Sequence, residues 1–160
     1  MRRAAEHPIN GRMIFVSATD GAGGSPGLVA AWDRYQGGCL PRLRDRLAGS
    51  AAHLARVRLI SAEHGLLHPL TNVPPETGVM TEQQAREHQP LAMEKLRAEF
   101  TRDGMPRELM VLTEFPYSLV IDDLFHVEPP RPHISLFTMT PGGDRSWTPI
   151  AAKLDDWGWP

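Results

Sequence analysis

The stretch VRLISAEHGLLHP, residues 57–69, contains the signal that decides the fold. A short β-type run, residues 57–60, passes directly into a polar turn with the sequence Ser61-Ala62-Glu63-His64-Gly65. A short apolar run bounded by turn residues is typical of a strand buried on both faces of a sheet. We therefore expect a buried strand here, with the polar turn at its carboxyl end.

Similar runs predict three more strands, at residues 13–16, 109–112 and 133–137. Apolar residues spaced by three and four predict helices between and after the strands, over residues 41–47, 81–100, 117–125 and 147–157. Alternation of short apolar strands with helices indicates an α/β protein. We expect a three-layer sandwich with a central, mainly parallel sheet.

The longest predicted helix has a clear start signal. Thr81 is a good N-cap, and Gln84 three residues later completes a capping box. Pro90 predicts a kink or restart inside the helix. The inner side is expected to include Leu91, Leu96 and Phe100. Before this helix, residues 66–79 read as a Pro-rich loop.

Length and composition describe an ordinary globular protein. The 160 residues are 41% hydrophobic and 22% charged, with a formal net charge of -2, so charge alone does not attract the chain to nucleic acid. We expect one domain over residues 13–160 after a flexible leader, residues 1–12. The single cysteine, Cys39, and the lack of a long apolar run predict a cytoplasmic protein that makes no membrane contact.

Ligands of parallel α/β sheets bind outside the carboxyl ends of the strands. Three predicted strands end in polar residues at this edge: Ser17-Ala18-Thr19-Asp20, Ser61-Ala62-Glu63-His64-Gly65 and Thr113-Glu114. The sequence therefore places a candidate ligand site at this edge.

Glu63 and His64 are the first candidates for chemistry. A carboxylate in a cleft can orient or deprotonate a water or stabilise positive charge, and an imidazole can bind phosphate or donate a proton. Asp20 is a second candidate carboxylate, although Asp-Gly is also a common turn. The alternative is that Glu63 caps backbone amides and His64 is solvated.

Two further segments are candidates for binding. The glycine-rich loop, residues 17–27, could hold an anion with its amides and with Ser17 or Thr19, or it could be a surface loop. It matches neither a dinucleotide nor a P-loop pattern. In the second segment, residues 35–38, a nucleobase could stack on Tyr35 beside Gly37 while Gln36 reads its edge, unless Tyr35 fills the core.

Other kinds of site find no support in the sequence. The histidines have no metal-binding spacing, and no nucleophile elbow is present. We expect neither a metal nor a cofactor. A basic surface that could bind DNA would consist of Arg42, Arg44, Arg46, Arg56 and Arg58. The alternative is that these arginines form a solvated face.

The turn Ser61-Ala62-Glu63-His64-Gly65-Leu66-Leu67, followed by a Pro-Pro loop and a helix, resembles the YaaA peroxide-stress family and small YaaA-related domains of actinobacteria and phages. Val16-Ser17-Ala18 and Arg34-Tyr35 resemble the first strand end and the following element of that family. The family often has a Tyr in the loop that contains Glu76, which this chain lacks. The resemblance spans most of residues 13–137.

The resemblance implies a fold related to the uracil-DNA-glycosylase-like α/β sandwiches and a site for a nucleobase or nucleotide. We therefore expect an enzyme that cleaves or exchanges the N-glycosidic bond of a nucleoside or nucleotide. Glu63 or Asp20 would supply the carboxylate and His64 would contact phosphate or base. The remaining site residues would be Ser17, Ala18, Thr19, Tyr35, Gln36, Gly37, Ser61, Gly65 and Glu114. The alternative is a stress-response protein that binds nucleotides or DNA without catalysis.

Overall fold

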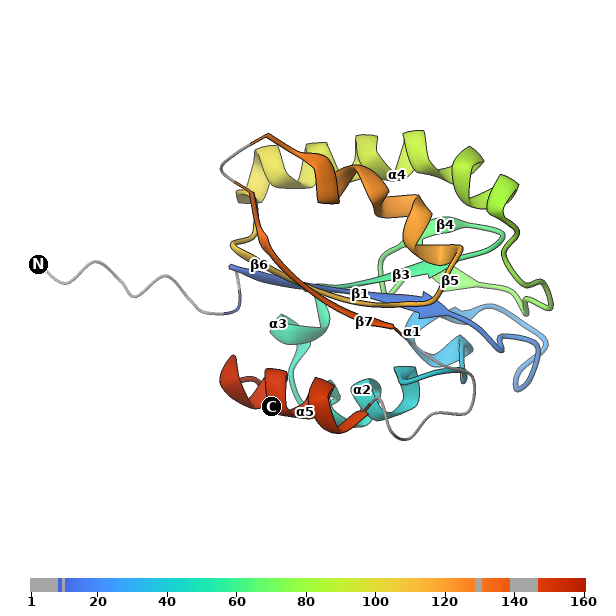
Figure 1. Ribbon diagram of the computed structural model, residues 1–160. Coiled ribbons are helices and arrows are strands. Elements are labelled where there is room, and N and C mark those ends of the chain that lie inside the picture. The colour runs from blue at the N-terminus through green and yellow to red at the C-terminus, as the bar shows by residue number, and fades with distance from the viewer. Residues whose placement is uncertain (1–8, 10, 129–130, 139–146) are drawn as a thin grey trace, which may run out of the picture.

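The computed structural model describes residue 9 and residues 11–128, 131–138 and 147–160 (Figure 1). The expected flexible leader, residues 1–12, lies mostly outside the described residues. The expected strand at residues 13–16 begins within the expected leader, because β1 spans Arg12–Ala18.

A five-stranded sheet forms the centre of the fold, in the order β4-β3-β1-β6-β7. The strands β3, β1, β6 and β7 are parallel, and β4 alone runs antiparallel to β3. The expected mixed α/β fold with a mainly parallel central sheet is therefore confirmed. The strand bounds are β1 (Arg12–Ala18), β3 (Val57–Ser61), β4 (Gly65–Leu67), β6 (Glu108–Thr113) and β7 (His133–Thr138).

Two short strands were not predicted from the sequence. β2 (Val29–Ala30) pairs with β5 (Asn72–Val73) in an antiparallel ribbon. This ribbon ties the glycine-rich loop after β1 to the Pro-rich loop before the longest helix. The expected loop over residues 66–79 is corrected accordingly, because it contains β5 and most of β4.

Helices cover both faces of the sheet, as Figure 1 shows. Along β1 the side chains alternate, so that Ile14 and Val16 pack on one layer and Met13 and Phe15 on the other. The first layer holds α1 (Ala31–Arg34), α2 (Leu40–Leu47), α3 (Ala51–Leu54) and α5 (Trp147–Asp156). The second holds α4 (Glu82–Asp103) and the 3₁₀ helix η1 (Tyr117–His126).

The helix α4 begins as its sequence predicts. The Thr81 side chain accepts a hydrogen bond from the Gln84 amide, and the Gln84 side chain accepts one from the Thr81 amide. The helix continues through Pro90 without ending. The expected inner position of Leu91 is wrong, because Leu91 is 55% exposed. The buried side of α4 consists of Ala85, Ala92, Met93 and Leu96.

The sheet has a topological switch point between β1 and β6. After β1 the chain enters the layer of α2, whereas after β6 it enters η1 on the opposite face. The two connections therefore diverge at the carboxyl ends of neighbouring strands, which is where open α/β sheets bind ligands. The end of β3 lies directly on the other side of β1, because Ala18 pairs with Ser61.

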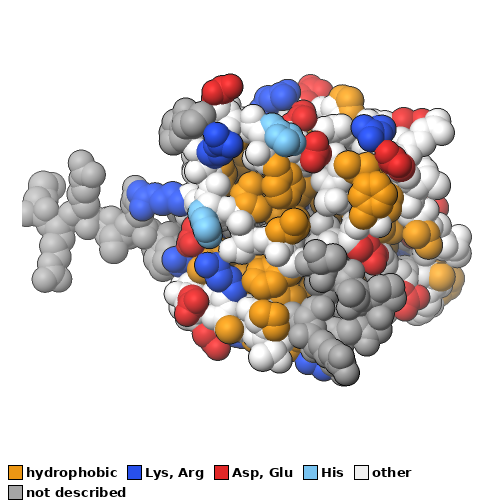
Figure 2. Space-filling model, viewed as in Figure 1, with side chains coloured by type: hydrophobic (Ala, Val, Ile, Leu, Met, Phe, Trp, Pro, Cys, Tyr) orange, Lys and Arg blue, Asp and Glu red, His pale blue; other side chains and the backbone are white. Residues whose placement is uncertain are grey.

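The surface seen in Figure 2 mixes charged and hydrophobic side chains. Hydrophobic groups reach the surface in several separate places along η1 and β7, where Leu136 is 55% exposed. Among the described residues, no helix has the length and apolar character needed to cross a membrane.

Candidate functional site

The polar turn after β3 is the loop of a hairpin. The pairs Leu59–Leu67 and Ser61–Gly65 join β3 to β4, which leaves Ala62, Glu63 and His64 as the loop. Gly65 has a positive φ of 67°, a conformation that glycine adopts without steric cost. A side chain there would also meet His88 at 3.0 Å. The glycine therefore closes the hairpin and fixes the direction in which Glu63 and His64 project.

A buried carboxylate, Glu76, holds this turn in place. Its side chain accepts hydrogen bonds from the Ser61 hydroxyl at 2.8 Å and from the Glu63 amide at 2.9 Å. The Tyr35 hydroxyl donates a third bond at 2.5 Å. Glu76 is only 3% exposed, so these donors replace the water that a buried carboxylate loses. In turn, Ser61 Oγ accepts a bond from the His64 amide at 3.1 Å.

Tyr35 serves this cluster as a hydrogen-bond donor. Burial, together with the bond to Glu76, raises the pKa of its hydroxyl, so the hydroxyl keeps its proton. The expectation that a base stacks on Tyr35 needs correction, because the residue is 0% exposed. The side chain of Gln36, which was expected to read the edge of a base, is already bonded within the chain. Its amide accepts from Arg44 at 2.8 Å and donates to the Asp33 carbonyl at 2.9 Å.

Glu63 and His64 remain accessible at the mouth of the turn. Their side chains are 48% and 32% exposed, and Glu63 Oε2 lies 3.9 Å from His64 Nε2. The His64 Nε2 atom is covered, yet it has no hydrogen-bond partner within the described part of the chain. The same holds for Thr113 Oγ1 at the end of β6. Buried polar atoms normally find a partner, so both atoms are unsatisfied groups at the candidate site.

Glu114 directly follows β6, beside the end of β1. Its amide donates to the Ser17 hydroxyl at 3.3 Å, which joins the ends of the two strands. Partial burial raises the pKa of the Glu114 carboxyl. Burial also raises the pKa of Tyr117, with smaller contributions from the charges of Glu114 and Glu76. Phe115 follows with an exposed ring, 68% accessible.

The glycine-rich loop folds around an arginine. The buried Arg34 guanidinium donates to the carbonyls of Gly23 at 3.2 Å and Ser25 at 2.7 Å, and to that of Gly27. It also reaches the Val73 carbonyl of β5 at 3.4 Å. The loop therefore encloses a cation, the Arg34 guanidinium. The described contacts provide no evidence for the expected anion site.

The other predicted binding residues lie around this loop. Ala18 is buried in the core at the end of β1. Thr19 packs so closely on Gly37 that a side chain at residue 37 would lie 2.0 Å from its hydroxyl. Asp20 is exposed, has a positive φ of 57°, and accepts a bond from the Gln36 amide through its backbone carbonyl. The structure therefore brings Asp20 to the rim of the edge and leaves its side chain in solvent.

The arginines that could form a basic surface are used within the fold. Arg44 donates to the Trp32 carbonyl at 2.9 Å, and Arg56 donates to the Arg12 carbonyl at 3.0 Å. Arg58 is buried and pairs with Glu99 at 3.0 Å. Arg46 binds Asp155, and Arg42 also has an interaction partner. These contacts do not favour a free basic face for DNA.

The described residues contain no group of three or more His, Cys, Asp or Glu side chains arranged to hold a metal ion. Comparisons of the sequence with models of protein families, with curated proteins and with solved structures find no match. The site is therefore interpreted from its own chemistry.

Sequence reasoning missed Glu76 and Tyr117. Glu76 lies 15 residues after Ser61 in a Pro-rich loop, and its amide donates to the Gly21 carbonyl at 3.0 Å. The available signal was an acidic residue directly after two prolines, which is also an ordinary surface turn. Tyr117, at the start of η1, accepts a bond from the Met80 amide at 3.4 Å. It had no distinguishing pattern beyond its place after Glu114.

Proposed function

We propose that this chain hydrolyses the N-glycosidic bond of a nucleoside at the edge formed by the ends of β3, β1 and β6. The observation that carries the proposal is the placement of two accessible carboxyl groups, Glu63 and Glu114, on either side of the end of β1. The arginines that contact this region, Arg34 and Arg44, donate to backbone carbonyls and to Gln36. The edge is therefore rich in negative charge.

Such an edge suits a reaction that develops positive charge. Cleavage of an N-glycosidic bond passes through an oxocarbenium-like sugar, which a nearby carboxylate stabilises. Water attacks the anomeric carbon and gives a proton to Glu63, the bond to the base breaks, and the base leaves with a proton from Glu114. The solvated Glu63 carboxylate, beside His64, is placed to orient the water. Glu114, whose pKa is raised by burial, is suited to protonate the departing base.

The same charges favour an uncharged nucleoside over a phosphate ester. A phosphate would lie among the acids Glu63, Glu76 and Glu114, and like charges repel strongly where burial lowers the effective dielectric. The accessible ring of Phe115, next to Glu114, offers a face on which a base can stack. Asp20, on the exposed rim, is the alternative carboxylate.

The proposal extends to the fold class, which we assign to the uracil-DNA-glycosylase-like α/β sandwiches. Its support is the mainly parallel sheet covered on both faces, together with the resemblance of the Ser61–Leu67 turn to the YaaA family. A nucleobase at the strand ends agrees with that resemblance.

The test is a chromatographic screen of the purified chain for release of free base from nucleosides, nucleoside monophosphates and short DNA. We expect release from a nucleoside that falls by about a hundredfold or more in Glu63→Gln and in Glu114→Gln. The matched control is Glu94→Gln, an exposed residue of α4, which should keep full activity.

Two results would contradict the proposal. Release that persists in both variants would remove these carboxyl groups from the reaction. Absence of release from every substrate would exclude the activity. If a nucleotide or DNA then raised the melting temperature, the site would bind without catalysis, which is the alternative function.

A further inference from the structure

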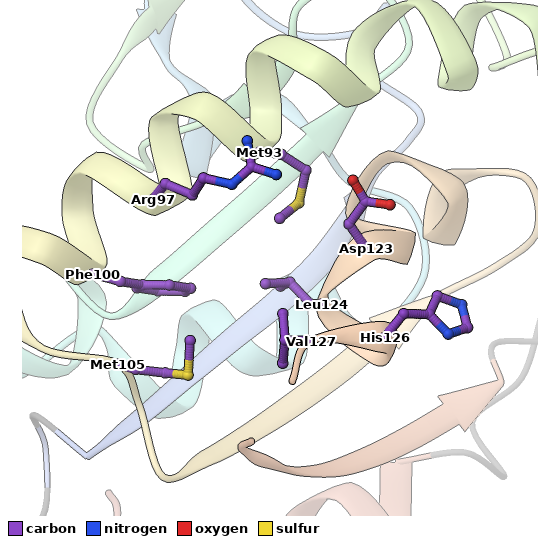
Figure 3. Close-up of a pocket in the computed structure, with 8 residues that line it drawn as sticks. All are labelled: Met93, Arg97, Phe100, Met105, Asp123, Leu124, His126 and Val127. Carbon is purple, nitrogen blue, oxygen red and sulfur yellow. The ribbon is translucent and has the colours of Figure 1, made fainter. Parts of the chain in front are cut away.

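A separate cavity lies between α4 and η1, at the other end of the sheet from the candidate site. Met105, on its wall, precedes the start of β6, whereas Glu114 follows the end of that strand. The cavity has a volume of about 290 Å³. Figure 3 shows the side chains that line it: Met93, Arg97, Phe100, Met105, Asp123, Leu124, His126 and Val127.

The floor of this cavity is apolar. Met93 and Leu124 are buried beneath it, Phe100 and Val127 are half-buried beside it, and Met105 is 44% exposed at its mouth. Methionine side chains adapt to the shape of an apolar group and make favourable contacts with aromatic rings. This floor therefore suits an apolar group of moderate size.

The rim of the cavity carries a cation and an anion that do not form an ion pair with each other. Figure 3 shows Arg97 extending from α4 toward η1, which carries Asp123. Arg97 has no hydrogen bond or ion pair within the described part of the chain. Asp123 accepts one bond, from Gln89 Nε2 at 3.1 Å, and retains further acceptor capacity. The Nε2 atom of His126 lies 3.5 Å from Oδ2 of Asp122, four residues earlier in η1.

We propose that this cavity binds a free α-amino acid with an apolar side chain, such as leucine or methionine. Its carboxylate would pair with Arg97 and its ammonium group with Asp123, while its side chain would occupy the floor over Met93 and Leu124. A ligand with a single charge leaves one of the two rim groups unpaired, whereas a zwitterion satisfies both. The cavity volume of about 290 Å³ lies at the lower end of the ~300–1,000 Å³ found for pockets of drug-sized ligands, which is enough room for a molecule of this size.

The first experiment titrates the full chain with L-leucine and L-methionine, using calorimetry or amide chemical shifts. We expect saturable binding below about 10 mM. Two analogues separate the charges: 4-methylpentanoate lacks the ammonium group and isoamylamine lacks the carboxylate. Each should bind at least about tenfold more weakly, because each loses one charge-assisted hydrogen bond. Equal binding of an analogue would overturn the proposal, since the cavity would then recognise only apolar surface.

The second experiment locates the site with matched variants. Arg97→Gln and Asp123→Asn should each weaken amino-acid binding at least about tenfold. Met105→Trp should abolish it by filling the mouth. The controls Lys95→Gln and Glu94→Gln change the charge of exposed α4 residues outside the cavity and should bind normally. The proposal fails if neither amino acid binds, or if binding is unchanged in Arg97→Gln and Asp123→Asn. Because the readout is binding, this outcome is independent of base release at the strand ends.

Discussion

At the scale of single residues, Glu76 joins three parts of the chain that lie far apart in the sequence. Its carboxylate accepts bonds from the Tyr35 hydroxyl of the first helical layer and from the Ser61 hydroxyl of β3. A third bond comes from the Glu63 amide in the hairpin loop. All three donors converge on one buried side chain, so the position of Glu63 at the candidate site depends on Glu76.

Replacing this carboxylate should destabilise the fold measurably. In Glu76→Gln an NH₂ group, which donates, replaces one carboxylate oxygen, which accepts. This group faces the hydroxyls of Tyr35 and Ser61, which in the native chain donate to Glu76. One or more buried bonds are then lost, and we expect the free energy of unfolding to fall by about 1–3 kcal/mol. Urea denaturation measures this change. Glu94→Gln, on the surface of α4, should change it by less than about 0.5 kcal/mol, and an equally small effect at Glu76 would contradict the role given to its bonds.

Glu114 makes stability depend on pH. Burial raises the pKa of its carboxyl above the ordinary value of 4.5. Between the two pKa values the folded chain therefore binds more protons than the unfolded chain, so the free energy of unfolding falls as pH rises through this window. Glu114→Gln lacks this titration and should gain stability relative to the native chain between about pH 4 and pH 7.

Urea denaturation across that pH range checks the sign of the effect. The difference between Glu114→Gln and the native chain should grow with pH and then level off above the folded pKa. The difference for the control, Glu94→Gln, should stay flat. A flat difference for Glu114→Gln as well would mean that the surroundings of Glu114 do not disfavour the charged carboxylate.

At the scale of elements, the sequence predicts what local patterns encode. The apolar runs that became β1, β3, β6 and β7 were each visible, and so was the capping box of α4. The strands β4 and β5, with three and two residues, were hidden because such short strands have no periodicity. Leu91 was misplaced because its spacing to Leu96 does not follow the buried positions of α4.

The helix α4 offers a prediction of its own at Pro90. A proline inside a helix has no amide to bond the preceding turn and costs ~3 kcal/mol relative to alanine. Proline also restricts the unfolded chain, which offsets about 0.4–1 kcal/mol of this cost. Because Pro90 is exposed, Pro90→Ala loses little buried surface. We expect the free energy of unfolding to rise by about 2–2.6 kcal/mol.

Chemical denaturation decides between this outcome and its opposite. The control is Lys95→Ala, an exposed change on the same helix that should alter stability by less than about 0.5 kcal/mol. A loss of stability in Pro90→Ala would show that the helix is adapted to its proline, for example through a bend that its contacts with η1 require.

At the scale of the whole molecule, the candidate site depends on contacts that no local pattern specifies. Its residues were expected to gather at the strand ends, and the structure does place Ser17, Ser61 and Glu114 at one edge. The orientation of each side chain was beyond prediction, since Tyr35 turns inward to a partner 41 residues away. Strand order has the same origin, because β1 lies between β3 and β6 only through packing of distant segments.

The central sheet also couples the two layers energetically. Ile14 and Val16 belong to the core beneath α2 and α5, and Met13 and Phe15 belong to the core beneath α4 and η1. Adjacent residues of one strand thus bury side chains in both cores. Loss of either layer exposes one face of β1 to water, at about 1.5–3 kcal/mol for each large side chain. The two layers are therefore expected to unfold together.

The chain provides two probes that report differently on the two layers. All four tryptophans, Trp32, Trp147, Trp157 and Trp159, pack in the α2 and α5 layer, so their fluorescence reports on that side. Circular dichroism reports on both layers, because α4, with 22 residues, lies in one layer, and α2 and α5, with 8 and 10 residues, lie in the other. We expect both signals to change at the same urea concentration, as two-state unfolding requires.

A variant on one side sharpens this test of a single domain over residues 13–160. Val120, in η1, is buried in the core on the face of the sheet opposite the tryptophan layer, and Val120→Ala should cost about 2 kcal/mol. If the sheet couples the layers, the fluorescence midpoint falls as much as the circular dichroism midpoint. If the fluorescence midpoint stays unchanged while circular dichroism shows an earlier transition, the two layers unfold independently, and the sheet must then remain folded on one face while its other face is exposed.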